Sequence, residues 1–111
     1  MSNPGPVPQV SVAQLPATPT VLDVREPDEW SAGHIDGALH IPLAELPGRL
    51  AELPAADPLV VTCRSGGRSS RATAYLQGMG IEAVNLDGGM HAWDDAGRSM
   101  VSETGAVPEV I

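Results

Sequence analysis

The 111-residue chain contains one cysteine, no phenylalanine and no lysine. A single cysteine excludes an internal disulfide and a zinc site built from cysteines alone. The three histidines stand apart from any cysteine partner, so no metal site is predicted, and no motif implies an organic cofactor. Because only two tryptophans and one tyrosine are aromatic, the core is expected to consist mainly of Val, Leu, Ile and Ala.

Positive charge is also scarce: six arginines face fourteen acidic residues, and the net charge is −8. Such a surface repels nucleic acids and anionic membranes, so neither is an expected partner. No apolar run approaches the ~20 residues that span a membrane. The first residues lack the features of a secretory signal, and a reactive thiol needs a reducing compartment. We therefore expect a cytoplasmic protein.

Half of the positive charge lies in one segment, which runs from Cys63 to Arg71. This segment follows the apolar run 59–62 and precedes a stretch with helical spacing, so the cysteine is predicted at a strand-to-helix junction. We interpret Cys63 as the candidate nucleophile. The candidate substrate-binding residues follow it directly: Arg64, Ser65, Gly66, Gly67, Arg68 and Ser69.

Several features of this loop favour a thiolate, which is the nucleophilic form of cysteine. Arg64 and Arg68 bring fixed positive charge close to the sulfur. A helix that opens near Ser69 directs unpaired N–H groups toward the loop. The glycines at 66 and 67 allow successive N–H groups to converge on one point, which makes a cradle for an anion.

Two alternatives to this interpretation come from the sequence itself. A lone cysteine after a strand is often a buried, inert residue, but charged side chains and paired glycines would have no packing purpose beside it. A cysteine phosphatase is the other alternative, and it requires five residues between cysteine and arginine. Here four residues separate Cys63 from Arg68, and Ser69 occupies the position that the phosphatase needs for arginine.

Apolar runs alternate with helical segments along the chain, which predicts an α/β domain with a mainly parallel sheet. Ligands bind such sheets beyond the carboxyl ends of the strands, where Cys63 is predicted to lie. We expect a flexible lead at 1–9, one domain at 10–97, and a tail at 98–111 that is poorly ordered or draped over the surface. The predicted strands are 10–12, 20–24, 38–41, 59–62 and 81–86. The predicted helices begin at Pro27, at Pro47 (running to about Leu53), at Ser69 or Ser70 (ending at Gly78 or Gly80) and after Gly89.

Other polar residues are assigned structural roles. Asp23 and Arg25 flank a strand end and are expected to form an ion pair that fixes the adjacent loop, with Glu26 and Glu29 as further candidates. His34 lacks the partners of a catalytic base and is expected to be a hydrogen-bonded structural residue. On the helix after the loop, Ala72, Tyr75, Leu76 and Met79 recur at helical spacing and are predicted to face the core.

The chain resembles the single-domain form of the rhodanese family. Four segments carry the resemblance: Asp23–Glu26 with Glu29 and Trp30, Gly33–Ala38 with Ile41 and Pro42, Cys63–Ser69, and Asn85–Met90 with Trp93. The resemblance runs from about Val10 to about Gly97. It implies a three-layer domain with helices on both faces of the sheet, structural roles near the site for Asp23 and Arg25, and sulfurtransferase activity. His34 is also placed near the site as a structural residue, on its lack of catalytic partners.

The resemblance also implies a reaction. Sulfane sulfur would move from a small anionic donor such as thiosulfate to cyanide, a thiol or a protein, through a persulfide on Cys63. A persulfide carrier or sulfur-sensing module without enzymatic activity is an alternative, as is an arsenate reductase or phosphatase on the same fold. The oligomeric state does not follow from the sequence.

Overall fold

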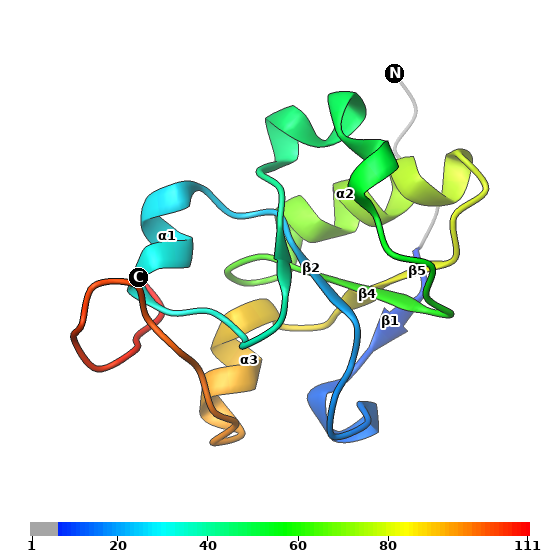
Figure 1. Ribbon diagram of the computed structural model, residues 1–111. Coiled ribbons are helices and arrows are strands. Elements are labelled where there is room, and N and C mark those ends of the chain that lie inside the picture. The colour runs from blue at the N-terminus through cyan, green and yellow to red at the C-terminus, as the bar shows by residue number, and fades with distance from the viewer. Residues whose placement is uncertain (1–6) are drawn as a thin grey trace.

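The computed structural model describes residues 7–111 and contains one parallel sheet with the strand order β1-β5-β4-β2-β3. Figure 1 shows this sheet between helix α2 on one side and helix α3 on the other. The predicted α/β fold with helices on both faces is therefore confirmed. The elements are β1 (Gln9–Val10), η1 (Val12–Gln14), β2 (Val21–Asp23), α1 (Pro27–Ala32), β3 (Leu39–His40), η2 (Leu43–Gly48), η3 (Leu50–Glu52), β4 (Leu59–Thr62), α2 (Gly67–Gly78), β5 (Ala83–Leu86) and α3 (Gly89–Asp95).

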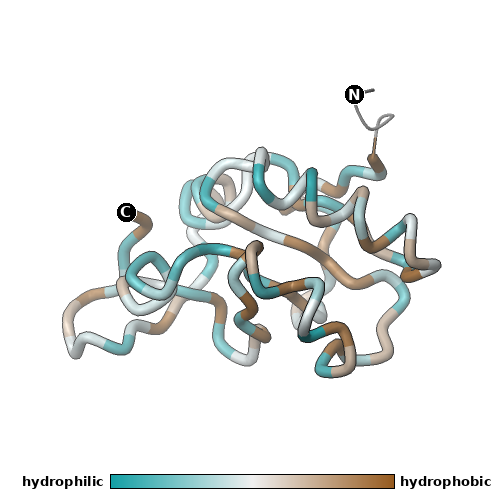
Figure 2. The backbone as a smooth tube through the Cα atoms, turned by 90° about the horizontal axis from the view of Figure 1, so that it is seen from above, coloured by the Kyte–Doolittle hydropathy of each residue, from teal (hydrophilic) through white to brown (hydrophobic). Residues whose placement is uncertain are grey.

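Successive side chains of a strand point to opposite sides of the sheet. Because helices cover both sides, the central strands are buried on both faces. Leu22 and Val61 pack in one core cluster with Leu76 of α2, and 3-10 helices η2 and η3 cover the same face. Val21 packs in the other cluster with Trp93 of α3. Figure 2 shows the hydrophobic segments running through the middle of the molecule. The expected aliphatic core is observed.

Helix α1 begins as its sequence predicts. Pro27 occupies the first helical position and Asp28 and Glu29 lie in the first turn, where proline lacks only an N–H that would be unpaired anyway and acids complement the helix dipole.

Helix α2 departs from the prediction at its start and on one face. It begins at Gly67 with Gly66 as its N-cap, so neither Ser69 nor Ser70 caps it. Tyr75 is 38% exposed and Met79 is 55% exposed, so these two side chains are not core residues. The buried face consists of Ser69, Ala72, Thr73 and Leu76, because the helix turns its polar side toward the active-site loop as well as its apolar side toward the sheet.

The helix predicted from Pro47 to about Leu53 is wrong. Two short 3-10 helices, η2 and η3, occupy this region, and Pro47 lies inside η2. A proline inside a helix cannot donate the backbone hydrogen bond that a regular α-helix requires there. The region still buries Leu46 against the sheet, which is the packing that the apolar spacing indicated.

The first and last segments of the described chain both pair with the domain, which corrects the prediction for residues 7–9 and agrees with the draped alternative for 98–111. Gln9, assigned to the flexible lead, belongs to β1 and pairs with Asn85 of β5; residues 1–6 of that lead lie outside the described residues. At the other end, the segment 98–111 is draped over the surface. Val101 forms a two-residue bridge with His34, and the N–H of Glu109 donates to Ala32 O at 3.0 Å.

The strand order places a topological switch between β2 and β4. From β2 the chain moves outward to β3, and from β4 it moves in the opposite direction to β5. The crossover connections therefore separate at the carboxyl ends of these two strands, which leaves a crevice where ligands bind open α/β sheets. Cys63 is the first residue after β4.

Candidate active site

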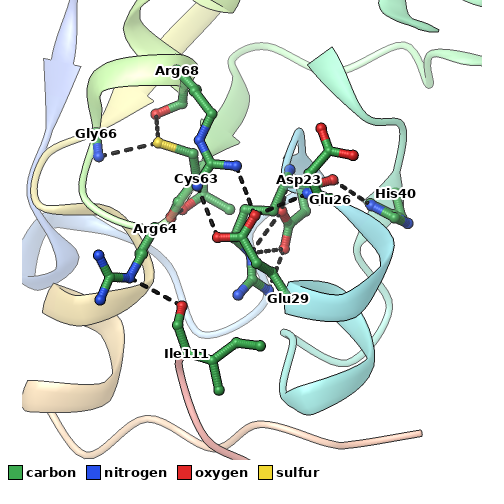
Figure 3. Close-up of polar contacts among 12 residues, drawn as sticks. Asp23, Glu26, Glu29, His40, Cys63, Arg64, Gly66, Arg68 and Ile111 are labelled. Carbon is green, nitrogen blue, oxygen red and sulfur yellow. Dashed lines mark hydrogen bonds and ion pairs between the residues drawn. The ribbon is translucent and has the colours of Figure 1, made fainter. Parts of the chain in front are cut away.

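Cys63 lies inside the loop that joins β4 to α2, at the centre of the sheet's carboxyl edge (Figure 3). Cys63 is 1% exposed. The N–H of Gly66 donates to the sulfur at 3.1 Å, and the hydroxyl of Ser69 lies 3.2 Å from it. The sulfur is therefore buried among hydrogen-bond donors rather than among aliphatic side chains alone.

These donors outweigh the effect of burial on the ionisation of Cys63. Burial by itself raises the pKa of the thiol. The hydrogen bonds from the Ser69 hydroxyl and from the backbone N–H groups of Ser69, Gly66 and Ser65 lower the pKa by a larger amount, so the net pKa lies below its ordinary value. Hydrogen bonds to the charged form stabilise that form. The arrangement thus favours a thiolate at a buried position.

Gly66 gives the loop its shape. Its φ of 115° lies in the left-handed region that side chains disfavour, and it is the N-cap of α2. Because the chain reverses there, the N–H of Gly66 turns back toward the sulfur. Gly67 begins the helix, while the side chain of Ser65 is exposed and contributes through its backbone N–H.

Gly89 supports the loop from the far side. The N–H groups of Met90 and His91, in the first turn of α3, donate to the carbonyl oxygens of Cys63 and Arg64 at 2.8 and 3.1 Å. A Cβ on Gly89 would lie 2.5 Å from the carbonyl oxygen of Cys63. The absence of a side chain at this position is what allows the helix to approach the active-site backbone.

We expect Gly89→Ala to lower the free energy of unfolding by about 2–4 kcal/mol, because it adds a backbone clash to the cost of a positive φ. Gly37→Ala is the matched control, since Gly37 also has a positive φ of 82° but a Cβ there has no neighbour within 4 Å. That control should cost about 1 kcal/mol. Urea unfolding of both variants measures the difference, and equal losses would show that the close approach is unimportant.

Arg68 is held by Glu29 of α1. Two parallel hydrogen bonds of 2.7 and 2.8 Å join the guanidinium to the carboxylate, and the two side chains are only partly exposed. The hydrogen bonds from Arg68 lower the pKa of Glu29 to about 2, against the opposing effect of burial. The sequence suggested that Arg68 binds the donor's anionic end, but in the structure this charge is already paired.

Arg64 is also engaged. Its Nε donates to the carbonyl oxygen of Ile111 at 3.0 Å, so the C-terminal segment reaches the active-site loop (Figure 3). Arg71 lies exposed on α2. The three arginines that the sequence places together therefore have three different surroundings. Because Glu29 is paired with Arg68, the net positive charge at the loop is smaller than a count of arginines indicates.

Asp23 and Arg25 form a buried ion pair beneath the site. The guanidinium donates to both oxygens of the Asp23 carboxylate, with the shortest contact at 2.8 Å, and to the carbonyl oxygen of Gly33 at 2.7 Å. Within residues 7–111, Arg25 Nη1 is the buried side-chain atom that has no hydrogen-bond partner. The pair connects the end of β2 to the end of α1. Glu29, which was a further candidate for this ion pair, is paired with Arg68 instead.

His34 is buried and makes structural contacts. Its Nδ1 lies 2.9 Å from the carbonyl oxygen of Trp30, and its ring stacks on the Trp30 indole with centroids 3.6 Å apart. His40 stacks against the same indole at 4.7 Å. These contacts fix α1 against the loop that follows it, so that the helix presents Glu29 to Arg68.

Metal binding and membrane insertion also find no support in the described part of the chain. No group of three or more His, Cys, Asp or Glu side chains among residues 7–111 could hold a metal ion. Over the same residues, no helix has the length and apolar character needed to cross a membrane.

The fold and site define an α/β protein with an activated thiol at its topological switch point, cradled by backbone N–H groups. Comparison with known proteins identifies it further: a family model described as Rhodanese-like domain matches residues 9–96. The chain belongs to this family, and sulfur transfer is the general activity that its named relatives support.

A sulfurtransferase from Allochromatium vinosum is 41% identical over 77% of this chain and 80% of its own length. The thiosulfate sulfurtransferase GlpE of Stutzerimonas stutzeri is 37% identical over 78% of this chain and 80% of its own. A rhodanese-related protein from Thermoplasma volcanium has a similar solved structure, with a TM-score of 0.79 and 33% identity over 85% of this chain and 97% of that chain.

Asn85 and Ile111 are among the residues at the site that were not assigned to it from the sequence. Asn85, on β5, contacts the Ser69 hydroxyl, and Ile111 reaches Arg64 from the far end of the chain. Asn85 could have been suspected, because a polar residue within an apolar strand needs a buried partner. Nothing in the sequence signals the contact of Ile111, since it depends on the path of an irregular segment.

Proposed function

We propose that this protein transfers sulfane sulfur from a donor such as thiosulfate to a thiophilic acceptor, through a persulfide on Cys63. The observation that carries the proposal is the sulfur of Cys63, which accepts hydrogen bonds from Gly66 and lies beside the Ser69 hydroxyl. Its lowered pKa provides the thiolate that the first step consumes. The name of the Stutzerimonas relative supports thiosulfate as the donor.

The reaction has two steps. The thiolate of Cys63 attacks the outer sulfur of thiosulfate, a new S–S bond forms, and sulfite leaves with the electrons of the broken bond. An acceptor such as cyanide or a thiolate then attacks the outer sulfur of the persulfide, and the Cys63 thiolate leaves. Dividing the transfer into two displacements requires only one nucleophile in the protein.

The loop serves both steps by holding negative charge. N–H groups aimed at the sulfur before the reaction need no reorganisation as charge develops, and each such donor contributes about 3 kcal/mol in a dry site. The acceptor in the cell would be a thiol or a protein. A compartment that keeps Cys63 reduced, such as the cytoplasm, suits this chemistry.

Intact mass spectrometry tests the proposal. Incubation of the reduced protein with thiosulfate should add one sulfur atom, and later addition of cyanide should remove it and release thiocyanate. Steady-state kinetics with both substrates should follow a ping-pong pattern. A protein that gains no sulfur from thiosulfate or from an alkyl persulfide would contradict the proposal.

A persulfide carrier is a second candidate, which the burial of Cys63 at 1% exposure favours. Cyanide attacks a buried persulfide slowly because it cannot reach the outer sulfur. A partner protein that opens the loop could reach it. The two functions differ in the second half of the same experiment. Rapid loss of the added sulfur to cyanide indicates an enzyme, and retention over many minutes indicates a carrier.

A further inference from the structure

The hydroxyl of Ser69 has two neighbours that both accept hydrogen bonds. One is the sulfur of Cys63 at 3.2 Å, and the other is Oδ1 of Asn85, at a short distance. A serine hydroxyl carries only one proton, so it cannot donate to both acceptors together. All three residues are buried, and water does not readily supply a second proton. The two acceptors therefore compete.

The amide of Asn85 is oriented by its other contacts. Its Nδ2 donates to Oε1 of Gln9 at 2.9 Å and lies 3.4 Å from the carbonyl oxygen of Gly66. Rotating the amide by half a turn would place Oδ1 against the Gly66 oxygen. The orientation that satisfies this network leaves Oδ1 facing the Ser69 hydroxyl.

We propose that Asn85 is a positioning residue that competes with the sulfur of Cys63 for the hydroxyl proton of Ser69. When Cys63 is a thiol, its S–H donates to Ser69 Oγ, and the hydroxyl donates to Asn85. When Cys63 is a thiolate, the hydroxyl turns to the sulfur and the Asn85 oxygen loses its partner. Asn85 thus weakens the thiolate while Gly66 and Ser69 stabilise it.

This competition has a use in the proposed function, on which this step of the argument rests. Once the persulfide forms, the charge resides on the outer sulfur, and Ser69 can return to Asn85. When the acceptor removes the outer sulfur, Cys63 leaves as a thiolate and the hydroxyl turns back to it. The nucleophilicity of a thiolate falls as its pKa falls. By limiting how far the Ser69 hydroxyl lowers the pKa of Cys63, Asn85 keeps the attacking sulfur reactive.

Other charged groups near Cys63 must stay constant for the competition to be measured. The charged and titratable groups on the elements around the loop are Arg64 in the loop itself, Arg68 on α2 with its partner Glu29 on α1, Asp23 and Arg25 at and just after the end of β2, Asp87 after β5 and His91 on α3. None of them is altered in the variants below, so differences between variants report the hydroxyl.

The test is the pH dependence of alkylation of Cys63 by iodoacetamide, which needs no sulfur donor. Asn85→Ala should free the Ser69 hydroxyl for the sulfur and raise the acid dissociation constant of the thiol about threefold to tenfold. Asn85→Leu, which has a similar size, no charge and no acceptor for the hydroxyl, should change it in the same direction. Circular dichroism and thermal unfolding establish that each variant is folded.

A purely structural role for Asn85 predicts a different sign. If the residue only supported the loop, Asn85→Ala would loosen the donors and weaken the thiolate, which would overturn the proposal. If Asn85→Ala fails to fold, the Asn85→Leu profile decides, and an unchanged or opposite profile there also overturns it.

The Ser69→Ala background isolates the shared proton. In that background the hydroxyl is absent, so Asn85→Ala should alter the dissociation constant by less than about twofold, whereas an undiminished effect would refute the mechanism. These measurements do not depend on sulfur transfer. A protein that shows the coupling but takes up no sulfur would contradict the proposed function alone.

Discussion

Replacing Cys63 with serine is expected to lower the rate of sulfur transfer from thiosulfate to cyanide by at least about 10³-fold. A serine hydroxyl is not ionised at neutral pH and forms no persulfide, so both displacements lose their sulfur atom. The thiocyanate assay measures the rate, and intact mass should show no added sulfur on the variant.

The control for this variant is its stability. Serine is slightly smaller than cysteine and retains an acceptor for the N–H of Gly66, so the thermal unfolding midpoint should change little. A folded Cys63→Ser protein that still turned over thiosulfate would assign the reaction to another group and remove the basis of the proposed mechanism.

Arg68→Ala is expected to lower kcat/KM for thiosulfate about tenfold or more, although Arg68 is paired in the structure. The variant leaves Glu29, which is largely buried, without its partner. The unpaired carboxylate would leave a negative charge beside the active-site loop, where it disfavours both the thiolate and the approach of an anionic donor. The measurement is steady-state kinetics with thiosulfate, together with the pH profile of Cys63 alkylation.

The double variant Arg68→Ala with Glu29→Gln distinguishes this mechanism from direct binding of the donor by Arg68. Removing the carboxylate as well should restore much of the lost kcat/KM if the unpaired charge is the cause. If Arg68 binds the donor itself, the double variant should be as poor as the single one. Arg71→Ala, which removes an exposed arginine from the same helix, should change kcat/KM less than about twofold.

Much of the architecture followed from local sequence patterns. The apolar run at 59–62 is strand β4 with the bounds that the pattern indicated, because a strand buried on both faces must be apolar throughout. Pro27 and its acids placed α1 correctly. The prediction of a helix from Pro47 to about Leu53 was wrong, because the spacing of leucines indicates which residues are buried but not which type of helix buries them.

The candidate loop was also identified from the sequence, since glycines and arginines after a strand have few structural uses. The contacts of its charged side chains were not identified from the sequence. The spacing of Arg64 and Arg68 indicated two free cations, while the fold brings Glu29 to one and Ile111 to the other. Those partners are 39 and 47 residues away along the chain, and local periodicity contains no information about them.

The sequence by itself therefore determined the family of folds, the position of the nucleophile and the loop that surrounds it, because these depend on residues close together in the chain. Only the tertiary structure decided how strongly that nucleophile is ionised. The pKa of Cys63 reflects burial, which raises it, and the hydrogen bonds from Ser69, Gly66 and Ser65, which lower it. The burial of the sulfur and the position of the Ser69 hydroxyl exist only when the sheet and α2 have packed together.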